Sequence, residues 1–312
     1  MKQKVVNRGE LAKTINSQKS ILICSTSFES RWKSVIEDVG LENWSQVLLF
    51  NNSARNDNTG TLYEEGDNLT YAPSNYNDPV DVLMTCNRLM LPALKKQIQR
   101  GNQIIFDIST FTREMLLIIL KVLDYFEFLK HTSFVYTPSK SMNKNWLSKG
   151  VLNTRSVLGY AGDFDLNNET HLVVLSGFEI ERSIEAIEEY EPTHLTVLSG
   201  NKLSSYSGAY YERSKELVDT LKTHYGSSVS SEEIDITDLG KLKSYFLEFL
   251  SSDRFRDQNI VIAPLSNKIS TLALGLAILE FKRPQVIYPQ PAEYNMNGYS
   301  EASDEYYLFI NE

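Results

Sequence analysis

The chain has 312 residues, which exceeds the size at which a single hydrophobic core usually keeps growing, so two domains are expected. Hydrophobic residues at 42% and charged residues at 23% exclude disordered, collagen-like and fibrous proteins. A formal net charge of -9 excludes broad electrostatic binding to duplex nucleic acid or to anionic membranes, although it allows a local basic pocket.

The first twenty residues are polar and lack the apolar centre of a secretory signal. The longest apolar run, Met115 to Leu120, is far shorter than the roughly 20 residues that a membrane helix needs. These features predict a cytoplasmic protein. Cys24 and Cys86 lie in separate apolar stretches, without the close spacing of metal ribbons or redox pairs, so we expect reduced thiols in the core.

Short apolar runs rich in Ile, Val and Leu alternate with amphipathic segments along the whole chain. In the first half these runs occupy residues 21–24, 47–50, 103–108 and 133–136, and in the second half they start at residues 171, 194, 259 and 285. Apolar runs of this kind, separated by helical patterns, indicate buried parallel strands with crossover helices. We therefore predict an α/β fold with mainly parallel sheets.

The second series of runs repeats the first in three blocks. The paired segments are ILICSTSFESRWKSVIED with LVVLSGFEIERSIEAIEE, IIFDISTFTREMLLIILKVL with IVIAPLSNKISTLALGLAIL, and FVYTPS with VIYPQP. The separation from Phe28 to Asp107 is similar to that from Phe178 to Ala263, which chance matches of short words rarely give. The repeat predicts two tandem Rossmann-like units related by internal duplication, residues 1–150 and 151–312, with the boundary in the polar segment 139–169.

Three polar segments have two interpretations each. Asn51 to Asp78 and Asn201 to Tyr211 follow the second strand of each half, either as long loops near a site or as variable surface loops. The C-terminal segment after residue 288 is rich in Tyr, Asn and Pro. It either folds over the second unit's site and stacks on a base, or covers an edge strand.

The turns after the first strand of each half are candidate anion-binding sites. They contain Ser25, Thr26, Ser27 and Phe28 in the first half, and Ser176, Gly177 and Phe178 in the second. A turn that follows a parallel strand and opens a helix presents unpaired N–H groups and the positive end of the helix dipole. Neither turn has the glycine pattern of NAD-binding or ATPase loops. The alternative is that these small residues only form tight turns and caps.

Glu29 and Glu179 hold equivalent places in the first helical turn after these loops. A carboxylate there is favoured by the helix dipole and can close a capping box. Alternatively, each accepts hydrogen bonds from a ribose or base edge, or acts as a general base. Arg31 and Arg182 lie in the same helical turns and could pair with these carboxylates or reach a phosphate, but their offset by one residue argues against a shared role.

The segment Asp107-Ile108-Ser109-Thr110-Phe111-Thr112-Arg113 follows a predicted strand and opens a helix. It places an acid, hydroxyls, free backbone amides and a guanidinium at the carboxyl edge of the sheet. Its counterpart, Pro264-Leu265-Ser266-Asn267-Lys268, keeps a serine and a cation but lacks the acid.

In Asp107, Ser109 and Arg113 the sequence resembles the CRISPR-associated Rossmann fold family, CARF, whose ligand loop reads Asp or Asn, any residue, Ser or Thr, three residues, then Arg or Lys. The tandem arrangement is similar to SAVED domains and tandem CARF proteins. The resemblance implies a cyclic or linear oligonucleotide second messenger, bound across the interface of the two units in a prokaryotic antiviral system. A separate effector chain would be the protein partner. The turns at residues 25–27 and 176–177 would hold phosphates through backbone amides. The opposite wall would be formed by Ser109, Thr110 and Arg113 together with Ser266 and Lys268, and Asn267 belongs to the same ligand loop as the last two. The missing acid implies an altered or inactive second loop.

Two further interpretations stay open. An enzyme acting on a nucleotide or sugar phosphate in the cleft between the units, or slowly cleaving its oligonucleotide ligand, would use Glu29 or Glu179 as base and Arg113 or Lys268 to stabilise phosphate charge. The chain could also be a non-catalytic subunit of a defence complex. The four histidines are scattered, and HExxH, GxSxG and cysteine clusters do not occur, so we expect neither a metal nor a cofactor.

Overall fold

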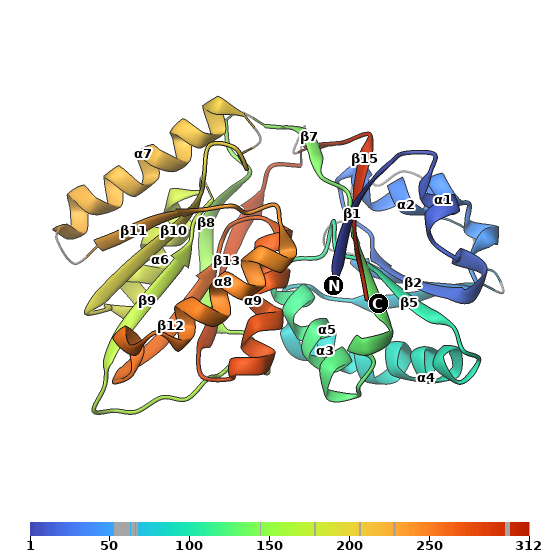
Figure 1. Cartoon of the computed structure of the whole chain (residues 1–312), viewed down its shortest axis with the longest axis horizontal. Coiled ribbons are helices and arrows are strands. Elements are labelled where there is room, and N and C mark those ends of the chain that lie inside the picture. The colour runs from blue at the N-terminus through green and yellow to red at the C-terminus, as the bar shows by residue number, and fades with distance from the viewer. Residues whose placement is uncertain are drawn as a thin grey trace. The chain divides into compact units, whose positions relative to one another are not determined.

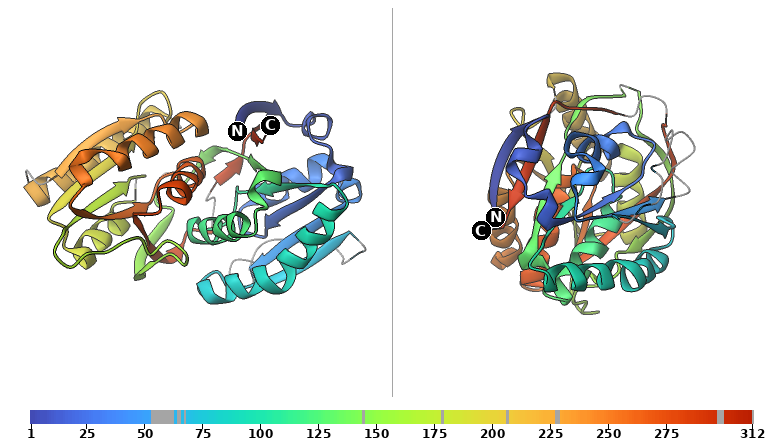
Figure 2. Two further views of the ribbon diagram at one scale, coloured as in Figure 1. Left: turned by 60° about the horizontal axis from the view of Figure 1, so that its bottom comes forward. Right: turned by 90° about the vertical axis from the view of Figure 1, so that its right-hand side faces the viewer.

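The computed structural model describes residues 1–52, 63, 66, 68–143, 145–177, 179–205, 207–226, 229–296 and 300–311. The chain forms two compact units, here called unit 1 (Met1–Asn143 with Met296–Glu312) and unit 2 (Lys144–Asn295). The C-terminal segment belongs to unit 1, whereas the predicted division assigned all of 151–312 to the second unit. The chain ends lie side by side because β1 (Lys2–Asn7) pairs with β15 (Glu305–Ile310) in antiparallel register (Figures 1 and 2).

Unit 1 is built on a seven-stranded sheet with the order β1-β15-β6-β5-β2-β3-β4. Its parallel strands are β2 (Ser20–Ser25), β3 (Gln46–Asn52), β4 (Leu69–Ser74), β5 (Gln103–Asp107) and β6 (Thr132–Tyr136). They pair with one another in parallel, and β15 pairs with β6 in antiparallel register. All six residues of β2 are buried, because helices cover both faces of the sheet.

The helices of unit 1 lie in two layers (Figure 1). One layer contains α1 (Leu11–Thr14), the short 3-10 helix η2 (Ser30–Lys33) and α2 (Ser34–Val39), and the other contains α3 (Pro79–Thr85), α4 (Leu91–Gln99) and α5 (Arg113–Tyr125). Trp32 and Val35 of the first layer pack on Leu22 and Leu49 of the sheet. Burial of these large apolar side chains is the main source of stability for such a layer.

Unit 2 has a six-stranded sheet with the order β11-β10-β9-β12-β13-β8. Its strands are β8 (Ser148–Ser156), β9 (Glu169–Leu175), β10 (His194–Gly200), β11 (Val229–Ile234), β12 (Gln258–Pro264) and β13 (Gln285–Tyr294). The helices α6 (Ile180–Tyr190) and α7 (Gly208–Tyr225) cover one face, and α8 (Leu239–Ser251) and α9 (Lys268–Phe281) cover the other (Figure 1).

The two units share one strand order, which confirms the predicted α/β fold with tandem Rossmann-like units. The parallel core reads β4-β3-β2-β5-β6 in unit 1 and β11-β10-β9-β12-β13 in unit 2. Each core is followed on its last strand by an antiparallel strand, β15 on β6 and β8 on β13. The backbone register also matches, since the Thr26 N–H donates to the Phe50 carbonyl as the Ser176 N–H donates to the Leu198 carbonyl.

Two of the polar segments that were expected to be loops contain regular structure. The strand β4 lies within 51–78, where residues 53–62, 64–65 and 67 are outside the described part of the chain, and α7 begins at Gly208 within 201–211. In the C-terminal segment, β14 (Ser300–Ala302) pairs with β7 (Ser139–Met142), and β15 covers the edge of β6. For the part of this segment that the structure describes, these pairings agree with the interpretation as an edge cover.

Gly162 has a backbone conformation that only glycine adopts without strain. Its φ is +65°, and a Cβ atom would lie 2.5 Å from the Gln285 nitrogen and 2.6 Å from the Arg283 oxygen. We expect Gly162→Ala to lower the free energy of unfolding of unit 2 by more than about 2 kcal/mol, because left-handed strain adds to a clash with rigid backbone. Denaturant unfolding measures this loss. The control Gly208→Ala, with nothing within 4 Å of the added Cβ, should leave stability almost unchanged.

Candidate functional site

Each parallel sheet has one point where adjacent strands send their chains to opposite faces. In unit 1 this is the carboxyl end of β2 and β5, which lead to α2 and α5, and in unit 2 it is the carboxyl end of β9 and β12, which lead to α6 and α9. Ligands of open α/β sheets bind outside the strands at such a switch point. The predicted site residues that the structure describes lie at the ends of these four strands, in the loops that follow them or at the first position of the next helix.

The hydroxyls of the unit 1 turn bond to the protein itself. Thr110 donates to the Ser25 carbonyl at 2.8 Å, which joins the loops after β5 and β2. The Thr26 hydroxyl accepts from the Asn52 N–H at 2.9 Å, and the Ser27 hydroxyl accepts from the N–H of the residue two positions on. These side chains are buried, whereas Phe28 is half-buried. These contacts agree with the interpretation in which the small residues shape tight turns.

Asp107 and Ser109, at the end of β5 and in the loop that follows it, are buried. One carboxylate oxygen of Asp107, Oδ1, accepts from the Ser109 N–H at 3.0 Å and from its hydroxyl at 2.5 Å, and the Ser109 hydroxyl accepts from the Thr137 N–H at 2.8 Å. Burial raises the pKa of Asp107 to about 6, against the opposing effect of the Ser109 hydrogen bonds and of the Arg31 charge. Asp107 Oδ2 and Thr137 Oγ1 have no hydrogen-bond partner among the described residues. The acid and the serine thus hold the loop in shape from inside the protein.

Arg113 is the first residue of α5 and is half-buried, so solvent reaches its side chain. The preceding residue, Thr112, caps the helix by accepting from the Met115 N–H at 3.1 Å. A capped helix start combines free N–H groups with the positive end of the helix dipole. Of the three residues that carry the CARF resemblance, Arg113 is the one that is not fully buried.

Glu29 is held in a buried ion pair. Its Oε2 accepts from Nε of Arg31 at 3.0 Å and from a terminal nitrogen at 2.5 Å, and the Ser300 hydroxyl donates to the same oxygen at 2.6 Å. Arg31 also donates to the Thr137 carbonyl at 2.9 Å. The two charged side chains are only 5% and 7% exposed. This set of contacts, here called the unit 1 clamp, ties the loop after β2 to the end of β6 and to β14.

Unit 2 repeats the clamp with different spacing. Arg182 donates to the Pro289 carbonyl at 2.9 Å and to Glu179 Oε2 at 3.4 Å, and the Ser148 hydroxyl donates to Glu179 Oε1. Pro289 follows Tyr288 of β13 in the way that the clamp residue of unit 1 follows the last tyrosine of β6. The two arginines therefore share a role, contrary to the expectation from their offset.

The two arginines lie on helices of different type. Arg31 lies on the 3-10 helix η2, whereas Arg182 lies on the α-helix α6. A 3-10 helix has fewer residues per turn than an α-helix. Arg31 lies two residues after Glu29, and Arg182 lies three residues after Glu179.

The unit 2 turn requires its glycine. A Cβ atom on Gly177 would lie 2.9 Å from the backbone oxygen of Leu265, so the loops after β9 and β12 approach too closely for a side chain. The Ser176 hydroxyl is buried and has no hydrogen-bond partner among the described residues. Phe178 lies outside the described residues.

The loop after β12 ends in a helix-capping residue followed by a cationic residue, as the loop after β5 does. Asn267 caps α9, accepting from the Ser270 N–H at 2.8 Å, and its amide donates to the Ile236 carbonyl at 2.9 Å. Lys268 is the first residue of α9 and is half-buried, while Ser266 is buried. Both units therefore present a capped helix start followed by a cation that solvent reaches.

Asn52 and Ser74 are polar residues of this edge that the sequence analysis did not single out. They end β3 and β4, and both side chains are buried. In the sequence, the signal for such a position was the pair Asn51 and Asn52, directly after an apolar strand. Because such residues are also typical of turns, the sequence pattern alone did not distinguish a buried amide from an ordinary loop residue.

The two thiols, of Cys24 and Cys86, and the buried histidine, His171, are not among the candidate site residues. Cys24 and Cys86 are free and buried, as predicted. Burial, and next the Asp107 charge, raise the pKa of Cys24 well above its ordinary value, and burial raises the pKa of Cys86 to about 12. His171, near the amino end of β9, bonds to Gln258 Oε1 at 2.9 Å and to Thr196 Oγ1 at 2.8 Å.

His171 makes stability depend on pH. Burial lowers its pKa to about 4, with smaller effects from the charges of His194 and Arg254, so the unfolded chain takes up the proton more readily than the folded chain. Its stabilising contribution is complete above about pH 6.5 and is lost as pH falls toward about 4, by roughly 2 kcal/mol after allowance for solvent screening. Denaturant unfolding as a function of pH measures this slope. His171→Gln should flatten it, and an unchanged slope in the variant would contradict the assignment.

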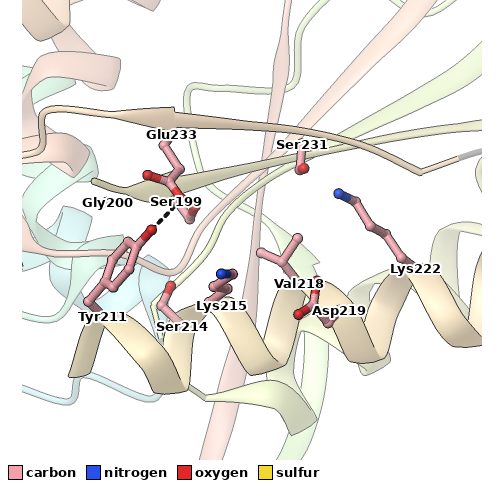
Figure 3. A pocket seen from close by; sticks show the side chains of 10 residues that line it. All are labelled: Ser199, Gly200, Tyr211, Ser214, Lys215, Val218, Asp219, Lys222, Ser231 and Glu233. Carbon is pink, nitrogen blue, oxygen red and sulfur yellow. Dashed lines mark hydrogen bonds between the residues drawn. The ribbon is translucent and has the colours of Figure 1, made fainter. Parts of the chain in front are cut away.

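A small pocket lies between α7 and the strands β10 and β11 of unit 2 (Figure 3). Its volume is about 110 Å³. Lys222 extends toward β11, and the Tyr211 hydroxyl donates to Glu233 at 2.8 Å. The two lysines of the lining are balanced by two carboxylates, Asp219 and Glu233, so the pocket offers no net attraction to a phosphate.

The described residues contain no group of three or more His, Cys, Asp or Glu side chains that could hold a metal ion. Across the same residues, every helix is too short or too polar to cross a lipid bilayer.

No protein-family model and no curated protein matches the sequence. A type III CRISPR defence DNA nuclease activated by cyclic oligoadenylate aligns over 86% of this chain and 65% of its own, with 7% identity and a TM-score of 0.45. The adenylation, ketoreductase and pseudo-Asub structure of a keto acid-selecting NRPS module aligns over 91% and 31%, with 11% identity and a TM-score of 0.25. An α,α-trehalose-phosphate synthase (UDP-forming) from Burkholderia vietnamiensis aligns over 83% and 91%, with 9% identity and a TM-score of 0.20. The chain thus spans less than two thirds of the first two proteins, and alignments this weak assign it to no family.

Proposed function

We propose that the chain is a nucleotide-binding sensor, whose ligand is a phosphorylated cyclic or linear oligonucleotide bound at the carboxyl edges of the two sheets. The observation that carries the proposal is the repeated pair of a helix cap and a cation, Thr112 with Arg113 on α5 and Asn267 with Lys268 on α9. Free N–H groups, the helix dipole and a cationic side chain together favour a phosphate. The overall charge of -9 leaves such local sites as the places where an anion is attracted.

The clamps favour binding over catalysis. A general base must be able to reach the proton that it removes. The carboxylates of Glu29 and Glu179 instead accept from Arg31 and Arg182 and from serine hydroxyls. We assign these carboxylates a structural role, which leaves the candidate enzyme without a base at these positions.

The CARF resemblance of Asp107, Ser109 and Arg113 supports an oligonucleotide among the phosphorylated ligands. We further propose that the chain acts in prokaryotic antiviral defence and that its protein partner is a separate effector chain.

Incubation of the purified full chain with three classes of compound tests the function directly. The compounds are short cyclic and linear oligoribonucleotides, mononucleotides and sugar phosphates, and the readouts are retention by the protein and chromatographic analysis of products. We expect retention of an oligonucleotide without products. Turnover would show the enzyme instead, and neither retention nor turnover of any compound would favour a structural subunit.

Arg113→Ala is expected to weaken binding of the retained oligonucleotide by roughly tenfold to a hundredfold, because a charge-assisted contact to phosphate contributes about 1.5 to 3 kcal/mol. The control is Arg100→Ala, which removes an arginine charge from an exposed position just before β5 rather than just after it. Lys268 on α9 has an equivalent control in Arg256, which precedes β12. Affinity of Arg113→Ala within about twofold of wild type would show that this loop does not hold the phosphate.

A further inference from the structure

Asn52 and Ser74 place unsatisfied polar atoms inside unit 1. Both amide atoms of Asn52, Nδ2 and Oδ1, and the hydroxyl of Ser74 have no hydrogen-bond partner among the described residues. The side chains are 0% and 5% exposed, and the two residues are paired as the last register partners of β3 and β4. Partners in a parallel pair project from the same face of the sheet, so three unsatisfied atoms share one location.

This location adjoins the loop that carries Arg113. Phe50, two residues before Asn52, projects from the same face and packs against Phe111 with 5.5 Å between the ring centroids. The Asn52 backbone N–H donates to Thr26 at 2.9 Å, which links it to the turn after β2. The unsatisfied atoms therefore belong to the same carboxyl edge as the proposed phosphate site.

A buried amide without hydrogen bonds is a large cost to a folded protein, and such groups are rare in native structures. The fold itself does not need polar side chains here. In unit 2 the equivalent register pair is Gly200 and Ile234, at the ends of β10 and β11. The polar pair in unit 1 is thus a property of this unit rather than of the repeated architecture.

We propose that Asn52 and Ser74, which are covered in this structure, become accessible when the ligand binds and form a specificity subsite of unit 1 that reads the edge of one nucleobase, and that unit 2 has no counterpart. The inference rests on the proposed function. A carboxamide presents a donor and an acceptor side by side, and the edge of a nucleobase offers the complementary pair. A phosphate offers acceptors only and is matched by Arg113 instead. The two units then have unequal roles, since only unit 1 distinguishes bases.

The test compares matched oligoribonucleotides that differ only in their base, bound to the full wild-type chain and to Asn52→Leu, which has a similar shape. Wild type is expected to prefer one base by about fivefold to a hundredfold, the range of one bidentate contact. Asn52→Leu is expected to bind all bases within about twofold of one another while keeping the salt dependence of affinity that phosphate contacts produce. The control Asn87→Leu changes an exposed amide of the same unit and should keep the preference.

Unfolding without ligand gives a second readout. Because Asn52 makes no side-chain hydrogen bond to the described residues, Asn52→Leu should leave the Tm unchanged or raise it. A lower Tm would show that the amide has a structural partner and would overturn the subsite, as would a base preference that survives in Asn52→Leu. If wild type binds an oligonucleotide through Arg113 but ranks all bases equally, the subsite alone fails. If wild type binds no oligonucleotide, the proposed function fails with it.

Discussion

Arg31→Ala is expected to lower the free energy of unfolding of unit 1 by about 3 to 5 kcal/mol, because it leaves a buried carboxylate without its counter-charge. The Glu29 side chain is 5% exposed, and its Oε2 would keep only the Ser300 hydroxyl among the clamp contacts described above. The Thr137 carbonyl would also lose its donor. Denaturant unfolding of the full chain, followed by a probe in unit 1 such as the fluorescence of Trp32, measures the loss.

Two variants separate the clamp from a general effect of losing an arginine. Replacement of both charges in Glu29→Gln/Arg31→Met should restore most of the stability, because no unpaired charge remains buried. Arg8→Ala removes an exposed partner of Glu37, 3.6 Å away, and should change stability by less than about 1 kcal/mol. If Arg31→Ala lowered the free energy of unfolding no more than Arg8→Ala does, Glu29 would not be held in the unit 1 clamp. Its assignment as a structural rather than a catalytic residue would then be wrong.

Asp107→Asn is expected to raise the free energy of unfolding at neutral pH by about 2 to 3 kcal/mol. The reason is that the wild-type folded state must keep a buried carboxylate ionised at this pH, which costs free energy. The pKa of Asp107 is raised to about 6 by burial. The folded chain therefore binds this proton more readily than the unfolded chain, and stability falls as pH rises from about 4 to about 6. The asparagine keeps an oxygen for the two Ser109 donors.

The pH profile identifies the residue. His171 contributes a slope of opposite sign in an overlapping pH range, so the wild-type profile reflects a difference between the two groups. The stability difference between Asp107→Asn and wild type isolates the carboxylate, and it should grow between about pH 4 and pH 6 and then stay constant. A difference that does not change with pH would show that Asp107 titrates at its ordinary pKa.

The shared core of the two units could be predicted from sequence because buried parallel strands are apolar on both faces. ILIC and HLVVLSG stand out for this reason, and the three repeated blocks predict that the two units have the same strand order, which the structure shows. The strands β4 and β11 did not stand out, since LTYAPS and VSSEEI lie at the outer edge of their sheets and mix polar with apolar residues. The antiparallel strand β15 was also hidden, because its partners β1 and β6 are both distant from it in sequence.

The site was predictable as a set of loops but not as a set of contacts. The position of Arg113 after a strand and at a helix start follows from local pattern alone. The clamp of Arg31 depends on Thr137 and Ser300, which are distant from it in sequence. Local pattern carries no information on such long-range partners.

The most direct test of the account is a crystal structure of the full chain with the retained oligonucleotide. The account predicts a phosphate oxygen within hydrogen-bond distance of the Arg113 guanidinium or the Lys268 ammonium group, beside the first N–H groups of α5 or α9. A ligand that instead occupies the pocket under α7, or any place away from the carboxyl ends of the parallel strands, would contradict it.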